Sequence, residues 1–452
     1  MPAFPLDPDR LRWRTELRAL ADRRLRPLAD KGEPGRVNRP LLAELGGLGL
    51  LSRLFTSGAL DLCLMRESLA AVCTEAETAL ALQGLGAHPV HTHGTDAQRT
   101  RWLPGVSDGT TVAAFALTEP DAGSDAAALN LRATPEPDRA PAASPDASPA
   151  DRPSGGPAVS PDARQGGDPL SAPPGDGRTR QDGESPGART GAAPDPGGGS
   201  REAAVALGAE PDGPSGWRLT GDKCWISNAP EADFYTVFAR TGPGAGARGV
   251  TAFLVPADRP GLTGSPLDML SPHPIGTLRF DAVPVTADDM LGEPGHGFRV
   301  AMGTLNLFRP SVGAFAVGMA QAALDATVTH TAHRRAFGGA LSDLQTVAHQ
   351  VAEMALRTEA ARLMVYAAAT AYDEGATDVP QRAAMAKLLA TETAQYVVDT
   401  AVQLHGARAL RRGHLLEHLY REVRAPRIYE GASEVQRDII ARHLYAPTGE
   451  RP

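Results

Sequence analysis

Four short segments of the chain hold residues whose types could do chemistry. Residues 115–125, FALTEPDAGSD, set hydroxyl groups beside a glycine-containing turn, where hydroxyls and free amides can bind the polar edge of a flat cofactor. Residues 225–227 are Trp-Ile-Ser, and an indole packs well against an aromatic ring. Arg334 carries a planar fork that suits phosphate oxygens. Glu430 is a carboxylate that could remove a proton if its surroundings raised its pKa.

Each of these features also has a plain structural explanation when it is taken alone. A type I turn accounts for residues 120–123, Pro-Asp-Ala-Gly. A tryptophan in a strand often belongs to a core, and a single arginine or glutamate is most often a solvated surface charge. Only the combination of the segments therefore indicates a function.

Several common chemistries have no support in the sequence. No G-x-G-x-x-G opens a helix after a strand, and neither a phosphate-binding P-loop nor a G-x-S-x-G elbow is present. Three close histidines lack a standard metal spacing and an acidic or cysteine neighbour, so we expect a polar loop at His88, His91 and His93. The cysteines form no C-x-x-C pair, which favours free thiols in a reducing compartment at Cys63, Cys73 and Cys224.

The bulk properties narrow the class of protein. A chain of 452 residues is too long for one ordinary core. The net charge of -8 gives no sign of a nucleic-acid-binding face. The N-terminus has no apolar signal region, and no run reaches the roughly 18 apolar residues of a membrane helix. We therefore expect a cytoplasmic protein that neither binds nucleic acid nor inserts into a membrane.

Hydrophobic periodicity predicts an α+β protein in the order helices, strands, helices. Residues 10–109 follow a helical pattern, including one long helix over 60–86 and a short one over 95–103. Short alternating runs between 112 and 286 predict an antiparallel sheet or barrel. Long amphipathic stretches then predict a four-helix bundle. The expected domains are N-terminal helical, middle β and C-terminal bundle, over residues 1–111, 112–290 and 291–452.

One segment does not fit any of these domains. Residues 134–215 contain no Phe, Trp, Tyr, Ile, Cys or Lys and are mostly Pro, Ala, Gly, Ser, Asp and Arg. Such a composition cannot bury enough apolar surface to offset chain entropy, so it predicts disorder. The flanking segments look like neighbouring strands of one hairpin, with the insertion in place of its turn.

Taken together, the motifs resemble the acyl-CoA dehydrogenase family over nearly the whole chain except the insertion. The resemblance is carried by FALTEPDAGSD, GDKCWISNAPEADFYTVFART, HRRAFGGALSDLQ and IYEGASEVQRDIIARHL, which occupy residues 115–125, 221–241, 333–345 and 428–444. It implies an acyl-CoA dehydrogenase-like fold and FAD as cofactor. The residues that the resemblance places against FAD are Phe115, Leu117, Thr118, Gly123, Ser124, Trp225, Ile226, Ser227, Arg334, Phe337, Gln345, Gln403, Gly406, Ala407, Ala432 and Glu434.

The resemblance also implies the reaction and its base. Glu430 matches the residue that removes the α-proton of an acyl thioester while a hydride leaves the β-carbon. Some family members carry the base at the position of Phe308, which cannot act as one, so Glu430 has no competitor. The substrate contacts implied by the same matches are Ser124, Asn306, Arg309 and Gly431.

Some positions depart from the family pattern. Ala336, Ala407 and Ala432 stand where Gln, Gly and a hydroxyl residue are usual. Residues 270–280, LSPHPIGTLRF, replace a Gly-x-Arg-x-Ser-x-Thr pattern and predict a different wall on the substrate and flavin side.

The sequence leaves two alternatives to acyl-CoA dehydrogenation open. An acyl-carrier-protein thioester could be the donor, or the chain could bind flavin without dehydrogenase activity. The resemblance further implies an electron-transfer flavoprotein as acceptor and a homodimer or homotetramer, because part of the FAD site is expected from a neighbouring subunit.

Overall fold

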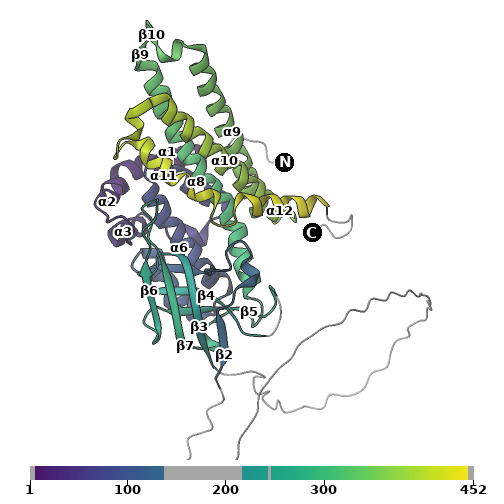
Figure 1. Ribbon diagram of the computed structural model, residues 1–452. Coiled ribbons are helices and arrows are strands. Elements are labelled where there is room, and N and C mark those ends of the chain that lie inside the picture. Colours follow the sequence, from purple (N-terminus) through teal and green to yellow (C-terminus); the bar gives the residue numbers. More distant parts are fainter. Residues whose placement is uncertain (1–5, 137–215, 243–245, 446–452) are drawn as a thin grey trace, which may run out of the picture. The chain divides into compact units, whose positions relative to one another are not determined.

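The computed structural model describes residues 6–136, 216–242 and 246–445. Helices come first, strands second and helices last along these residues (Figure 1). The predicted α+β class and the order of its parts are confirmed. The boundaries at 111 and 290 remain predictions. Most of the insertion predicted over 134–215 lies outside the described residues.

Helices form the first part of the chain. The first runs from α1 through a π-helical stretch into α2, so it is continuous over residues 8–29. Asp7 caps α1, Asn38 caps α3 and Thr95 caps α7, each accepting a backbone N–H with its side chain. The bounds are α1 Pro8–Leu20, α2 Arg26–Ala29, α3 Arg39–Gly47, α4 Arg53–Thr56, α5 Ala59–Ala70, α6 Thr74–His93 and α7 Asp96–Asp108.

Three local predictions in this part were wrong. The helix expected over 60–86 is broken between α5 and α6, where Val72, Cys73 and Thr74 place low-propensity residues in succession. The short helix continues through Pro104 to a left-handed Gly109, the usual stop signal of a helix. The three histidines expected in a loop lie in the last turns of α6.

The middle strands form an eight-stranded sheet with the order β6-β7-β3-β2-β4-β5-β8, and β1 pairs with β4. The sheet is mostly antiparallel, as predicted, but β4 runs parallel to both β1 and β2. Strands β2 and β3 pair antiparallel, which confirms the hairpin expected on either side of the insertion. The bounds are β1 Ala113–Ala116, β2 Arg132–Pro135, β3 Gly216–Ser227, β4 Phe234–Arg240, β5 Val250–Pro256, β6 Leu262–Pro266, β7 Ile275–Thr286 and β8 Met290–Leu291.

The last part of the chain is built around three long helices. Helices α8, α9 and α10 lie side by side, and the hairpin β9–β10 stands at their end away from the sheet (Figure 1). Two shorter helices follow, one of them not predicted. The bounds are α8 Gly297–His333, β9 Arg335–Ala336, β10 Gly339–Ala340, α9 Gln345–Asp373, α10 Val379–His405, α11 Leu415–Glu422 and α12 Ser433–Tyr445.

Helix α8 is the central element of this packing. A Cβ on Gly318 would lie 2.5 Å from the carbonyl oxygen of Glu67, so the missing side chain lets α8 approach α5 closely. Within the described residues, α8 is the one helix long and apolar enough to cross a membrane, but 72% of that window is buried in the protein. Its apolar composition is therefore explained by its place in the core.

Candidate active site

Glu430 lies on a strained loop that joins a short 3₁₀ turn to α12. Its φ is 52°, a left-handed value that is uncommon for a residue with a side chain, and the next residue, Gly431, has a φ of 93°. Such a conformation costs about 1–3 kcal/mol and persists only where the surroundings hold it.

Three side chains from three helices hold this loop through its two carbonyl groups. Arg309 of α8 donates from Nε to the Glu430 carbonyl at 3.3 Å. Lys387 of α10 donates from Nζ to the Gly431 carbonyl at 2.6 Å. Gln436 of α12 donates from Nε2 to both carbonyls, at 3.2 Å and 2.8 Å. The position of the Glu430 carboxylate is thus determined by tertiary contacts.

The carboxylate itself is desolvated and incompletely paired. Its Oε2 is buried and has no hydrogen-bond partner among the described residues. Burial raises the pKa of Glu430, while the positive charges of Arg66, Lys387 and Arg309 oppose that rise. A buried carboxylate with a raised pKa and a free oxygen is suited to accept a proton from a weakly acidic carbon.

Two predicted substrate residues lie beside this loop on α8. Arg309 is buried and also donates from Nη1 to Asn306 Oδ1 at 3.2 Å. Phe308, between them in sequence, is buried and packs its ring against His88. Asn306, Arg309, Glu430 and Gly431 are therefore brought together.

A second group of predicted residues forms the end of β3. Trp225 is 56% exposed and has a φ of 58°, so a large apolar ring stands on a strained backbone with one side open. Asn228 holds the turn by donating from Nδ2 to the Ala113 carbonyl at 2.8 Å. Ser227 is half-buried, whereas Ile226 belongs to the core and can offer only its backbone to a ligand.

The segment around Thr118 lies directly against this turn. Its carbonyl accepts a hydrogen bond from the Cys224 amide at 3.0 Å. Leu117 is buried in the core, and its carbonyl accepts from Lys223 Nζ at 2.8 Å. Lys223 also pairs with Glu119, whose carboxylate accepts the amides that lead into β2. Buried charge therefore fixes the backbone here.

The remaining residues of this segment differ in how open they are. Phe115 is half-buried and stacks on Phe238 with centroids 4.9 Å apart. Gly123 and Ser124 are exposed, and a Cβ on Gly123 would meet no atom within 4 Å. The reversal is closed by two backbone bonds between Glu119 and Ala122. Thr118, Ser124 and Trp225 thus leave hydroxyls and one indole face accessible.

A third group lies far from Glu430. Arg334 follows the end of α8, 25 residues after Arg309, which corresponds to about 37 Å along a helix. Phe337, at the tip of the β9–β10 hairpin, is 89% exposed with a φ of 52°. His330 stacks on His405 at 4.1 Å, so the ends of α8 and α10 adjoin. This brings Arg334 near the predicted residues Gln403, Gly406 and Ala407.

Three predicted cofactor residues have no hydrogen bond or ion pair, among the described residues, to any of these three groups. Gln345 is exposed at the start of α9. Glu434 is exposed in the first turn of α12, with Arg437 at 3.6 Å, and Ala432 is half-buried just before that helix. No contact with the described residues assigns these side chains a role.

The motifs did not point to two buried ion pairs, one of which includes Arg66, whose charge acts on Glu430. Arg66 of α5 pairs with Glu77 of α6 and donates to Ser311 at 2.7 Å. His273, from the unusual 270–280 segment, lies 2.5 Å from Glu422 of α11, and both are buried. The backbone N–H of Asn228 donates to the Pro274 carbonyl at 2.8 Å. The 270–280 segment therefore connects the Trp225 turn with α11.

The histidines and cysteines behave as structural residues. Burial lowers the pKa of His88 to about 4, so it is neutral at physiological pH. No group of three His, Cys, Asp or Glu side chains among the described residues could hold a metal ion. The three cysteines are free and buried, as the sequence indicated.

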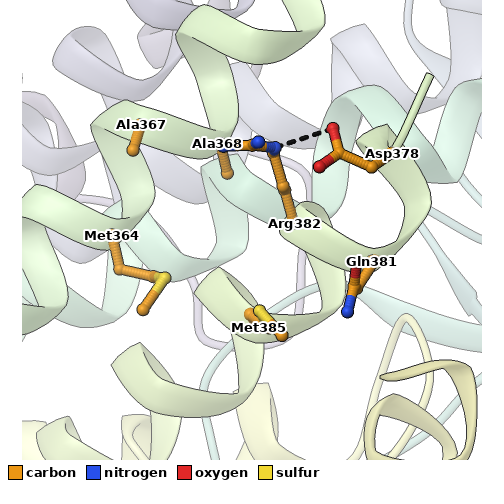
Figure 2. A pocket seen from close by; sticks show the side chains of 7 residues that line it. All are labelled: Met364, Ala367, Ala368, Asp378, Gln381, Arg382 and Met385. Atoms are coloured by element: carbon orange, nitrogen blue, oxygen red, sulfur yellow. Dashed lines mark hydrogen bonds and ion pairs between the residues drawn. The ribbon is translucent and has the colours of Figure 1, made fainter. Parts of the chain in front are cut away.

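One hollow adjoins these surfaces, and another lies apart from them. One of about 440 Å³ adjoins the Thr118 and Trp225 segments; its lining includes Pro120, Cys224, Thr263, Ser265 and Arg279. Figure 2 shows another, of about 240 Å³, between α9 and α10, where Arg382 and Asp378 are already paired at 2.7 Å. Met364 and Met385 line the second one, and none of the predicted site residues does.

Three family models match successive parts of the chain. Residues 7–110 match the acyl-CoA dehydrogenase N-terminal domain, 191–283 the middle domain and 295–445 the C-terminal domain.

Individual proteins agree with these matches. The probable acyl-CoA dehydrogenase FadE25 of Mycobacterium tuberculosis is 29% identical over 98% of this chain and 96% of its own length. The mitochondrial short-chain specific acyl-CoA dehydrogenase of Bos taurus is 43% identical over 55% of this chain and 61% of its length. The structure of butyryl-CoA dehydrogenase from Megasphaera elsdenii superposes with a TM-score of 0.76 at 27% identity, covering 98% and 99% of the two chains.

Proposed function

The chain belongs to the acyl-CoA dehydrogenase family, and from that premise we propose that it introduces a Cα–Cβ double bond into an acyl-CoA thioester with Glu430 as the base. The observation that carries the proposal is the Glu430 carboxylate, which is held on a strained loop and whose Oε2 is buried without a hydrogen-bond partner among the described residues. Within the described part of the chain, no other carboxylate combines these properties with a place beside Asn306 and Arg309.

The proposed reaction requires a base matched to a weak carbon acid. The α-proton of the thioester passes to the Glu430 carboxylate, and a hydride leaves the β-carbon with two electrons. Desolvation makes the carboxylate a better proton acceptor by raising its pKa, whereas Arg66, Lys387 and Arg309 keep enough of it ionised to act. Asn306 and Arg309 lie where they can orient the substrate beside this carboxylate.

FAD is the cofactor of this family, and the residues present fit it. The open indole face of Trp225, on a strained backbone, suits contact with a flat ring. Thr118, Ser124 and Ser227 supply hydroxyls at the same surface, and the missing side chain of Gly123 leaves space. When bound, FAD accepts the hydride that leaves the β-carbon.

We propose that a second copy of the chain completes the FAD site. Arg334 and Phe337 are exposed about 37 Å along α8 from Arg309, too far to hold the same ring as Trp225 and Glu430 within one chain. An arginine fork and an open aromatic ring suit the pyrophosphate and adenine of a cofactor that a neighbouring subunit binds. The proposed assembly is therefore at least a dimer, and its proposed acceptor is an electron-transfer flavoprotein.

The first test is an absorption spectrum of the purified protein, followed by anaerobic titration with short, medium, branched and aromatic acyl-CoAs. Bleaching of the flavin by one of them would support the reaction and narrow the acyl group. A flavin that stays oxidised with every CoA ester would count against an acyl-CoA substrate. The variant Glu430→Gln should bind FAD but lose turnover by several orders of magnitude, and retained turnover would sink the base assignment.

A further inference from the structure

Lysine is rare in this chain, and its placement is selective. Lysine and arginine together number 45, yet lysine occurs only at positions 31, 223 and 387. Lys223 and Lys387 are both 0% exposed. An ammonium group is strongly hydrated and expensive to bury, so it is retained in a core only where it makes specific contacts. Because almost all other basic residues of the chain are arginine, the two buried lysines are expected to make contacts that an arginine could not make.

Lys387 makes its hydrogen bond to the residue that follows the proposed base. Its Nζ donates to the carbonyl of Gly431 at 2.6 Å, one residue after Glu430. A charged donor to a buried carbonyl is among the stronger hydrogen bonds in proteins. It helps to hold the two left-handed residues of the loop, which fixes where the Glu430 side chain leaves the backbone.

The charged groups near Lys387 indicate which carboxylate interacts electrostatically with its ammonium group. Four charged groups act on it: Glu430, Arg309, Glu392 and Glu434. Glu392 is engaged by Arg427 at 2.9 Å and by Ser433 at 2.6 Å, and Glu434 is exposed. Glu430 is the one of the three carboxylates with a buried oxygen, Oε2, that has no partner among the described residues.

We propose that Lys387 is the positioning residue of the base: it fixes the Gly431 carbonyl so that the Glu430 carboxylate is correctly placed, and its ammonium favours the ionised form of that carboxylate. This inference rests on the proposed role of Glu430. Burial lowers the pKa of Lys387 to about 8, so the ammonium is mostly present at neutral pH. The Glu430–Lys387 interaction acts on both groups, so a change in either shifts the pKa of the other.

Lys223 offers a matched comparison beside the Thr118 segment. It is equally buried, with a pKa lowered to about 8, but its Nζ holds the Leu117 carbonyl and the Glu119 carboxylate. It supports the Thr118 segment, which is proposed to contact FAD. Loss of Lys223 should therefore weaken FAD binding without shifting the pKa of Glu430. Loss of Lys387 should shift the pKa of Glu430 and leave FAD binding nearly unchanged.

The variants Lys387→Met and Lys223→Met, with Thr391→Val as control, test this division. Thr391 lies one turn further along α10, is buried and donates to the Lys387 carbonyl at 2.9 Å. In Lys387→Met, the acid limb of the pH profile for substrate-dependent flavin bleaching should move up by about one pH unit, the size expected for one lost neighbouring charge. FAD affinity, measured by flavin fluorescence on reconstitution, should change less than threefold. In Lys223→Met, FAD affinity should fall at least tenfold, and the acid limb of the pH profile should stay at the wild-type position.

The second measurement does not depend on how a Lys387 variant folds. Wild-type protein labelled with ¹³C at lysine Cε has only three lysine signals, and the variants Lys31→Arg and Lys223→Met each remove one, which identifies the third as Lys387. In Glu430→Gln, the Lys387 signal should titrate at a lower pH than in wild type, because the carboxylate that stabilises its charge is gone. An unchanged Lys387 titration, or a Lys387→Met profile like that of Thr391→Val, would overturn the inference. Turnover retained by Glu430→Gln would instead overturn the proposed base.

Discussion

The guanidinium Nε of Arg309 lies 3.3 Å from the carbonyl oxygen of Glu430. This contact joins the middle of α8 to a loop 121 residues later in the chain. The same guanidinium binds Asn306 at 3.2 Å. A proposed substrate-orienting group and the proposed base are therefore parts of one hydrogen-bonded unit.

Replacing Arg309 with lysine should separate the charge from the geometry. A lysine keeps the positive charge but cannot donate simultaneously to Glu430 and Asn306 from a rigid fork. Loss of one charge-assisted bond worth about 1.4 kcal/mol predicts about a tenfold fall in kcat/KM. Steady-state kinetics with the preferred acyl-CoA measure it. Arg357→Lys, an exchange at an exposed Arg357–Glu353 pair, should leave kcat/KM unchanged. Equal rates for Arg309→Lys and wild type would remove Arg309 from the machinery.

Gly431 should not tolerate a side chain. Its φ of 93° is disfavoured for alanine by about 1–2 kcal/mol, and a Cβ would lie 2.5 Å from Gln436 Nε2, which holds both loop carbonyls. Gly431→Ala should therefore lower the free energy of unfolding by about 2 kcal/mol and reduce kcat. Gly375→Ala is the matched control, with a φ of 67° and no atom within 4 Å of the added Cβ. It should show only the backbone penalty and normal kcat; a similar loss of kcat in both variants would contradict the steric argument.

The His273–Glu422 pair should make stability depend on pH. Burial is the largest single effect on the pKa of His273 and lowers it, but Glu422, Glu75 and Glu77 together outweigh burial and raise the pKa above its ordinary value of 6.5. A raised pKa in the folded state means that the stabilisation is fully present below pH 6.5 and is lost as pH rises through the folded-state value. His273→Gln should therefore lower Tm more at pH 6 than at pH 9. A Tm difference that is the same at both pH values would show that the imidazole is not charged in the folded protein.

The elements of the fold could largely be predicted because apolar residues recur at helical and strand spacing over long stretches. The break at residues 71–73 could not be predicted, since one helical pattern continues across it. Only Val72, Cys73 and Thr74, three weak helix formers in succession, mark it. Glu430 was identifiable through its motif, but its left-handed φ was not, because tertiary contacts impose it. Lys387 and Arg66 are single charges in otherwise ordinary helices, and their burial depends on how α5, α8 and α10 pack. The scarcity of lysine was the one sequence signal for Lys387.

If the FAD site is shared between subunits, Arg334 and Glu430 of one chain serve different sites. Arg334→Ala should weaken FAD binding about tenfold to a hundredfold, as expected for loss of a charge-assisted contact to pyrophosphate. Arg335→Ala, at the exposed neighbouring position, is the control and should bind FAD normally.

Mixed oligomers then give the decisive measurement. Co-expression of Arg334→Ala and Glu430→Gln chains with different affinity tags allows hybrids to be purified through both tags. In a hybrid dimer, one site receives Glu430 from the first chain and Arg334 from the second, so it is intact, while the other site lacks both. Each parent should be nearly inactive at limiting FAD, and the hybrid should recover about half of the wild-type activity. A hybrid no more active than the average of its parents would show that Arg334 does not complete a neighbour's site, because only a shared site can restore function from two defective chains.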